Sequence, residues 1–160
     1  MLAQPIVVAA SVTAILYLKL LITQIIQGSM KKKAGLKGPE DGGKGFSSVA
    51  SAAPERLNDD GSCNHEAYEA AQRWERILGN DLENIPIGLI VMWAAASVIT
   101  TKPYEQPFLG YAIAFCVARI LHTLAYAFGQ QPFRTIAFLI GVIAVIGMLV
   151  LTIQVAFAAA

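Results

Sequence analysis

The sequence predicts an all-α integral membrane protein, a bundle of four transmembrane helices in a single domain. Of its 160 residues 56% are hydrophobic and 14% are Asp, Glu, Lys or Arg, whereas about 25% of a soluble domain is charged. Of the 12 Lys and Arg and the 11 Asp and Glu residues, all but five lie between Lys31 and Glu83. The remaining apolar stretches approach the roughly 20 residues that a helix needs to cross a bilayer. A chain of 17.1 kDa is too short for a second folded domain besides this bundle.

Four helices are expected, at about residues 5–27, 66–101, 107–128 and 132–157. The first stretch has no basic region before it and is longer than the apolar part of an ordinary signal peptide, so we expect a permanent anchor. The second helix has a polar first half, because helical spacing begins at Glu66, well before its apolar residues. Pro132 suits the first position of the fourth helix, where its missing N–H costs nothing.

The segment between the first two helices, at about residues 28–65, is rich in Gly and Pro and is predicted to be a loop. Its basic residues are Lys31, Lys32, Lys33, Lys37, Lys44 and Arg56. The only basic residue in the connection between the second and third helices is Lys102. The positive-inside rule therefore predicts a cytoplasmic loop, with the turn at residues 129–132 on the same side and both termini on the other.

Several classes of function are not expected. Basic residues cluster only at Lys31–Lys33, without interleaved aromatic side chains, which argues against nucleic-acid binding. No metal site is predicted, because His65 and His122 have no companions at ligand spacing. Cys63 lies in the polar segment and Cys116 in an apolar one, so a disulfide between them is not expected.

Polar side chains inside the predicted spans need an explanation, because each charged one costs about 2.5–3.5 kcal/mol on insertion scales. On the second helix, Arg76, Asn80 and Glu83 are spaced so that they share one face. Asp81 points away from that face. These residues lie toward the end of the helix that is predicted to be cytoplasmic.

The third helix carries a similar row. Arg119, His122 and Tyr126 fall on one helical face. Arg134 follows in the first turn of the fourth helix, near the same end. Two helical faces and a helix N-terminus are therefore expected at one depth in the membrane.

Two interpretations of these charges remain open. In the structural one, Arg119 pairs with Asp81 or Glu83, Arg76 pairs with a carboxylate of the loop, and Lys19 is a snorkelling or interhelical partner. In the functional one, the cations exceed the nearby carboxylates and form a cavity that suits a small anionic ligand with mixed charges.

Three motifs resemble those of the MAPEG family, the membrane-associated proteins of eicosanoid and glutathione metabolism. The run Arg-Ile-Leu-Gly-Asn-Asp-Leu-Glu-Asn-Ile at residues 76–85 is similar to the family's Asn-Asp-Leu-Glu-Asn signature. Residues 118–126, followed by Gln-Pro-Phe-Arg at 131–134, resemble its third-helix motif, and Gly-Pro-Glu-Asp at 38–41 resembles a motif of its first loop. The resemblance covers the chain in order and is closest to the branches of microsomal glutathione transferase 1 and microsomal prostaglandin E synthase 1.

The resemblance implies a homotrimer that binds glutathione between neighbouring subunits, with a lipophilic second substrate entering from the lipid bilayer. The implied activity is that of a glutathione transferase with glutathione peroxidase activity. The alternatives are a prostaglandin E synthase-type isomerase and a non-enzymatic, lipid-presenting scaffold. The implied location is the endoplasmic reticulum membrane in a eukaryote or the inner membrane in a bacterium.

The resemblance also implies a set of site residues. The catalytic candidates are Arg134 and Tyr126. The residues that match the family's glutathione site are Arg76, Asn80, Glu83, His122, Tyr126 and Arg134. Two more glutathione-binding candidates are Lys31, in place of a family arginine, and Thr135, as a hydrogen-bond donor. Charge complementarity assigns Glu83 to the ammonium of glutathione and the cations to its carboxylates. Three departures from the family pattern are noted. Relatives carry a basic contact where this chain has Leu78-Gly79, and they carry an arginine at the end of the first helix, where Lys31 is the nearest candidate. Phe138 agrees with the transferase branch better than with the isomerase branch.

The chemistry requires a glutathione thiolate. A thiol with a pKa near 8.5 must be shifted by about two units, roughly 2.7 kcal/mol, to be mostly ionised at neutral pH. A guanidinium at about 4 Å contributes about 4 kcal/mol at an effective dielectric constant of 20, and the first turn of a helix adds up to about 2 kcal/mol for an anion. Arg134 supplies both, so we expect it to stabilise the thiolate, with Tyr126 and Thr135 as secondary hydrogen-bond donors.

Overall fold

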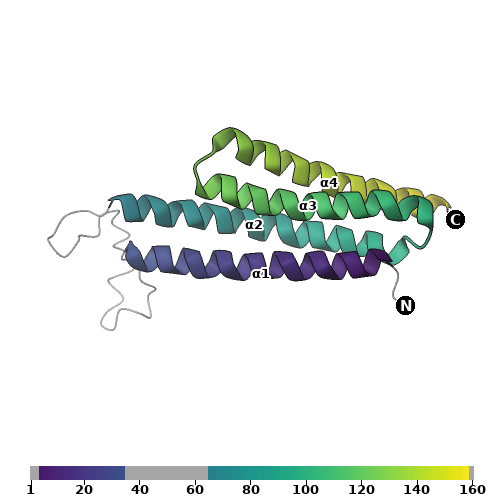
Figure 1. The fold of residues 1–160 in the computed structure, drawn as a ribbon, viewed down its shortest axis with the longest axis horizontal. Coiled ribbons are helices and arrows are strands. Elements are labelled where there is room, and N and C mark those ends of the chain that lie inside the picture. Colours follow the sequence, from purple (N-terminus) through teal and green to yellow (C-terminus); the bar gives the residue numbers. More distant parts are fainter. Residues whose placement is uncertain (1–3, 35–64, 159–160) are drawn as a thin grey trace. The chain divides into compact units, whose positions relative to one another are not determined.

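The computed structural model describes residues 4–34 and 65–158, which form four α-helices and their short connections. The helices are α1 (Gln4–Lys33), α2 (His65–Val98), α3 (Lys102–Ala127) and α4 (Gln131–Ala158) (Figure 1). Each is long and apolar enough to cross a membrane, which confirms the all-α prediction with four candidate spans. The Gly-Pro-Glu-Asp motif at 38–41 and Cys63 lie outside the described residues.

Three of the predicted helix ends were wrong. α1 continues through Gly28 to Lys33, because a helical glycine costs only about 1 kcal/mol and the lysines of the last turn interact favourably with the helix dipole. The loop therefore does not begin at residue 28. α2 ends at Val98, and α3 begins at Lys102 with Pro103 in its first turn, where a missing N–H costs nothing.

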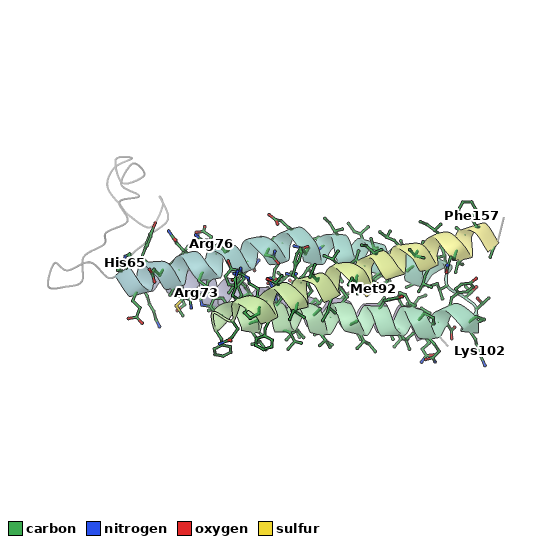
Figure 2. The ribbon with its side chains drawn as sticks, turned by 90° about the horizontal axis from the view of Figure 1, so that it is seen from above. His65, Arg73, Arg76, Met92, Lys102 and Phe157 are labelled. Atoms are coloured by element: carbon green, nitrogen blue, oxygen red, sulfur yellow. The ribbon has the colours of Figure 1, made fainter. Side chains whose placement is uncertain are left out.

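The described chain divides into two compact units, and α1 and α2 contribute to both. The first unit comprises residues 4–20 and 79–158, and the second comprises 21–34 and 65–78. In the first unit α3 and α4 lie side by side (Figure 1). Lys102 at the start of α3 and Phe157 near the end of α4 lie at the same end of this unit (Figure 2), as expected for antiparallel neighbours.

Small residues bring α4 close to α3. The buried residues of α4 recur every three or four positions, at Ala137, Gly141, Ala144, Met148 and Leu151, as expected for one packed face. A Cβ atom built at Gly147 would lie 2.5 Å from the Tyr111 ring. The ring therefore sits against the α4 backbone, as is typical of helices that pack in membranes through small residues.

The turn between α3 and α4 has a defined hydrogen-bond pattern. Gly129 has a φ of 69°, its N–H donates to the Tyr126 carbonyl (3.1 Å), and the Gln130 N–H donates to the Ala125 carbonyl (2.8 Å). This is a Schellman motif, with glycine in the left-handed conformation that ends the helix. The Gln130 carbonyl then accepts from the Arg134 N–H (3.1 Å), so the turn places Arg134 in the first turn of α4.

A buried charge cluster joins three helices of the first unit. The Asp81 carboxylate on α2 is fully buried; its Oδ2 atom pairs with Lys19 Nζ of α1, and its Oδ1 atom accepts from Arg119 Nη2 of α3 at 2.6 Å. Thr123 Oγ1 donates to Asp81 Oδ2 at 3.4 Å. Arg119 thus pairs with Asp81 rather than Glu83, and Lys19 is an interhelical partner, as the structural interpretation of these charges proposed.

We expect Asp81→Asn to destabilise the protein by about 3–5 kcal/mol, because it leaves the buried Arg119 and the partly buried Lys19 without their shared carboxylate. Thermal unfolding in detergent micelles measures the change. The matched control is Glu83→Gln, which removes the same charge from an exposed side chain on the same helix that makes no ion pair with the described residues. Equal melting temperatures for the two variants would contradict the role of Asp81.

A second expectation concerns the α3–α4 turn. Gly129→Ala places a Cβ atom in the left-handed region, at a cost of about 1–2 kcal/mol, and should lower the melting temperature. Gly110→Ala is the control, because Gly110 lies within α3 and an added Cβ meets nothing within 4 Å. If both variants melt like the wild type, the turn does not need its glycine.

Candidate functional site

The end of α3 and the start of α4 form an aromatic and cationic cluster in the first unit. Arg134 Cζ lies 4.3 Å from the centroid of the Tyr126 ring, within the range of a cation–π contact. The Tyr126 and His122 rings meet edge to face, with centroids 5.9 Å apart, and Phe138 lies 6.3 Å from His122 on its other flank. Three of the predicted site residues are therefore brought together.

Arg134 forms no ion pair with any carboxylate among residues 4–34 and 65–158. It is half-buried, and the first turn of α4 contains no acidic residue. Pro132 has no N–H. The N–H groups of Gln131 and Phe133 lie in the first turn of the helix, where no intrahelical carbonyl accepts from them. The start of α4 therefore combines the positive end of a helix dipole with a guanidinium that meets no carboxylate of the described residues, an arrangement that favours an anion.

His122 is only 3% exposed. Its Nδ1 atom has no hydrogen-bond partner within the part of the chain that the structure describes. A buried polar atom without a partner costs about 1–3 kcal/mol, and a ligand or water that hydrogen bonds to it would offset that cost. The ring contacts with Tyr126 and Phe138 hold the imidazole in place on the same cluster as Arg134.

Asn80 is oriented by Arg119. Its Oδ1 atom accepts a hydrogen bond from Arg119 Nη2 at 2.7 Å, and a guanidinium can only donate, so the amide oxygen must face Arg119. Its backbone carbonyl accepts from Asn84 Nδ2 at 2.8 Å. The Asn80 NH₂ group has no partner in the described chain and remains available as a donor.

The other predicted residues of the first unit lie at its surface. Glu83 is exposed and pairs with no cation of the described chain, so its charge is available to an ammonium group. Thr135 is exposed as well, and its hydroxyl donates to the Gln131 carbonyl at a long 3.4 Å. A weak bond of this kind leaves the hydroxyl free to turn toward a ligand.

Lys31 and Arg76 belong to the second unit. Lys31 Nζ lies 3.0 Å from Glu75 Oε1, and both side chains are partly exposed. Such a pair contributes about 0–1 kcal/mol, so a ligand carboxylate can replace Glu75 at little cost. Arg76 is exposed and forms no ion pair with the described residues; with Arg73 it projects from the first half of α2 (Figure 2).

Sequence reasoning did not find two of these contacts. It gave Asn84 no role, although Asn84 donates to the carbonyl of Asn80, and it used Phe138 only to choose between branches, although the ring packs on His122. Helical spacing was the available signal for the first contact, since Asn84 follows Asn80 by one turn. For Phe138 the spacing shows only that it follows Arg134 by one turn and shares its face of α4; the contact with His122 of α3 lies between two helices and has no such signal.

A comparison with protein families gives one match. The model of the MAPEG family matches residues 8–154, a range that includes the charge cluster, the aromatic cluster at Arg134 and most of the four helices. No curated protein matches the chain. The family match and the four apolar helices support an integral membrane protein. The chain belongs to the MAPEG family.

Proposed function

We propose that the chain is a membrane-bound glutathione transferase of the microsomal type, which also reduces lipophilic hydroperoxides with glutathione. MAPEG membership is consistent with a function in glutathione or eicosanoid metabolism. The observation that carries the proposal is Arg134, a cation in the first turn of α4 that stacks on Tyr126 and meets no described carboxylate. Such a group suits a thiolate better than it suits a structural role.

In the proposed reaction, Arg134 and the N-terminal turn of α4 lower the pKa of the glutathione thiol, whose proton leaves to water. The thiolate sulfur then bonds to the electrophilic carbon of the second substrate, and the leaving group departs with the electron pair of its bond. The Tyr126 and Thr135 hydroxyls donate hydrogen bonds to the sulfur. A shift of two units, about 2.7 kcal/mol, lies within what a guanidinium and a helix terminus supply together.

The rest of glutathione is proposed to bind by charge complementarity. Glu83 receives the ammonium, and Arg76, His122 and Lys31 receive the two carboxylates. The NH₂ group of Asn80 donates to a carbonyl or carboxylate oxygen, an assignment supported by the hydrogen bond that turns its oxygen toward Arg119.

Phe138 supports the transferase branch over the isomerase branch. The isomerase branch carries a tyrosine at this position, whereas Phe138 brings an apolar ring against His122 and has no hydroxyl to offer to a substrate oxygen. The branch of microsomal glutathione transferase 1 is therefore our choice. The proposed membrane is the endoplasmic reticulum of a eukaryote or the inner membrane of a bacterium.

The proposed assembly is a homotrimer in which glutathione binds between neighbouring subunits. Native mass spectrometry of the protein released from micelles should show three times the chain mass of 17.1 kDa. A monomer or dimer under conditions that retain activity would contradict this assembly.

The catalytic proposal is tested with Arg134→Ala. At neutral pH the conjugation of glutathione to 1-chloro-2,4-dinitrobenzene should fall by up to about 25-fold, because the thiol pKa rises by up to about two units toward its ordinary value and the ionised fraction falls from about three quarters to about 3%. The variant's rate should keep rising up to about pH 9, where a free thiol ionises, while the wild-type rate levels off at lower pH. The thiolate absorbance that glutathione gains on binding should be lost as well.

Arg73→Ala is the matched control, an arginine on the exposed face of α2 that lies outside the proposed site. It should retain the wild-type rate and pH profile. If Arg134→Ala conjugates as fast as Arg73→Ala, Arg134 does not stabilise the thiolate. If the wild type shows neither conjugation nor a thiolate signal, the transferase assignment fails and a lipid-presenting role is favoured.

A further inference from the structure

A groove of about 680 Å³ runs along the α3–α4 pair of the first unit. Its lining extends from Gly110 to Phe128 along α3 and its C-cap, and from Phe133 to Ile140 along α4. Between Gly110 and Leu124 a helix rises by about 21 Å. The groove therefore suits an elongated occupant.

Small side chains form the floor of this groove and larger ones form its walls. Ala118 is 2% exposed and Ala137 is 5% exposed, so both lie deep between the two helices. The apolar side chains on either side of them are longer and exposed, namely Val117 and Leu121 on α3 and Ile136 and Ile140 on α4. The floor is thus recessed between two rows of branched side chains.

The groove has one polar end. Its described lining contains no charged residue, and its one polar side chain is Gln130, which is exposed in the α3–α4 turn. Because α3 and α4 are both long and apolar enough to cross a membrane, the turn that joins them lies at the bilayer surface. The groove therefore begins at the level of the lipid headgroups and continues into the hydrocarbon.

The position of the groove indicates a lipid chain as its occupant. A space left empty loses dispersion contacts with its walls, and an apolar space does not hold water. The hydrocarbon of one leaflet is about 15 Å deep, half the thickness of the bilayer core. A groove that extends further than this along α3 accommodates one acyl chain from the headgroup level to the middle of the membrane.

A helix of a second copy fits the groove less well. A helix with its side chains is about 10–12 Å across, and helices in membranes approach closely where small residues face the partner. Here the outermost residues are branched, such as Leu121 and Ile140, and the small ones are recessed. A helix would rest on the walls and leave the floor empty, whereas a single hydrocarbon chain can reach the floor.

We propose that this groove binds one acyl chain of a phospholipid from the leaflet nearest the α3–α4 turn, with the headgroup at the level of Gln130. Lipid tails are as apolar as leucine, so the binding comes from packing against both walls and the floor rather than from the hydrophobic effect. The bound chain braces α3 against α4. The inference goes beyond the proposed function, since His122, Tyr126 and Arg134 do not line the groove.

The test uses a phosphatidylcholine that carries a diazirine midway along one acyl chain. The full-length protein is reconstituted with this lipid, transferred to an excess of unlabelled phosphatidylcholine and irradiated, and the crosslinked residues are identified by mass spectrometry. Crosslinks in the groove, for example at Leu121 and Ile140, should survive the transfer. Those at Ile143 and Ile153, which are exposed on α4 outside the groove, should be lost.

Two results of this experiment would overturn the proposal. If crosslinks in the groove disappear as fast as those at Ile143, the groove exchanges its lipid like the rest of the surface. If Ile143 is crosslinked before the transfer but the groove is not, a second copy or another segment covers the groove instead.

Variants that fill the groove test its role directly. Ala114 is half-buried in the lining, so Ala114→Phe should reduce the surviving crosslinks several-fold. Ile143→Phe is the matched control, because it enlarges an exposed residue of α4 outside the groove. Gly110→Leu is a second filling variant; an added Cβ there meets nothing within 4 Å, so the fold should tolerate it. Unchanged crosslinking in both filling variants would place the lipid elsewhere.

Thermal unfolding gives an independent measurement. A ligand that binds the folded state raises the melting temperature, so phosphatidylcholine added to the protein in micelles should raise that of the wild type and of Ile143→Phe. It should have little effect on Ala114→Phe and Gly110→Leu. An equal rise in all four proteins would contradict a lipid site in the groove.

Discussion

The carboxylate of Asp81 is the constraint on which the first unit depends. Within helices that cross a membrane a charge is tolerated only when it is paired or solvated, and this one carboxylate meets Lys19 of α1 and Arg119 of α3. Because all three side chains are held at one point, the three helices have one rotation and one register relative to one another in this unit. Apolar side chains of similar volume often stabilise a bundle equally well, so the particular contribution of this cluster is the geometry that it imposes.

The positions of Asp81 and Arg119 also determine the positions of candidate site residues nearby on α2 and α3. Arg119 turns the oxygen of Asn80 inward, so the amide presents its donor group. On α3, His122 lies one turn beyond Arg119 and Tyr126 one turn further, so the rotation that aims Arg119 at Asp81 also sets the face on which the two rings lie. The Gly129 turn then reverses the chain and brings Arg134 back over Tyr126.

The number and nature of the helices were predictable because hydropathy acts over whole segments, whereas their ends and contacts were not. Gly28 reads as a loop residue from its type, yet α1 passes through it, because one glycine costs little beside the packing of a long helix. The sequence spacing allowed Arg119 to pair with either Asp81 or Glu83. In the structure its partner is Asp81, which is inaccessible to solvent, whereas Glu83 is exposed. Spacing along one helix also carries no information about neighbouring subunits, so the trimer remains a proposal.

The cations of the first unit differ in whether a buried carboxylate pairs with them. Sequence reasoning counted Arg119 and Arg134 together as an excess of positive charge over the nearby carboxylates. In the structure, Arg119 and Lys19 are held by a buried acid, so their charge is largely committed to the fold. Arg134 contacts an aromatic face instead, and a cation–π contact leaves the guanidinium able to receive an anion in its plane. The proposed stabilisation of a thiolate therefore rests on Arg134 rather than on the sum of the charges in the first unit.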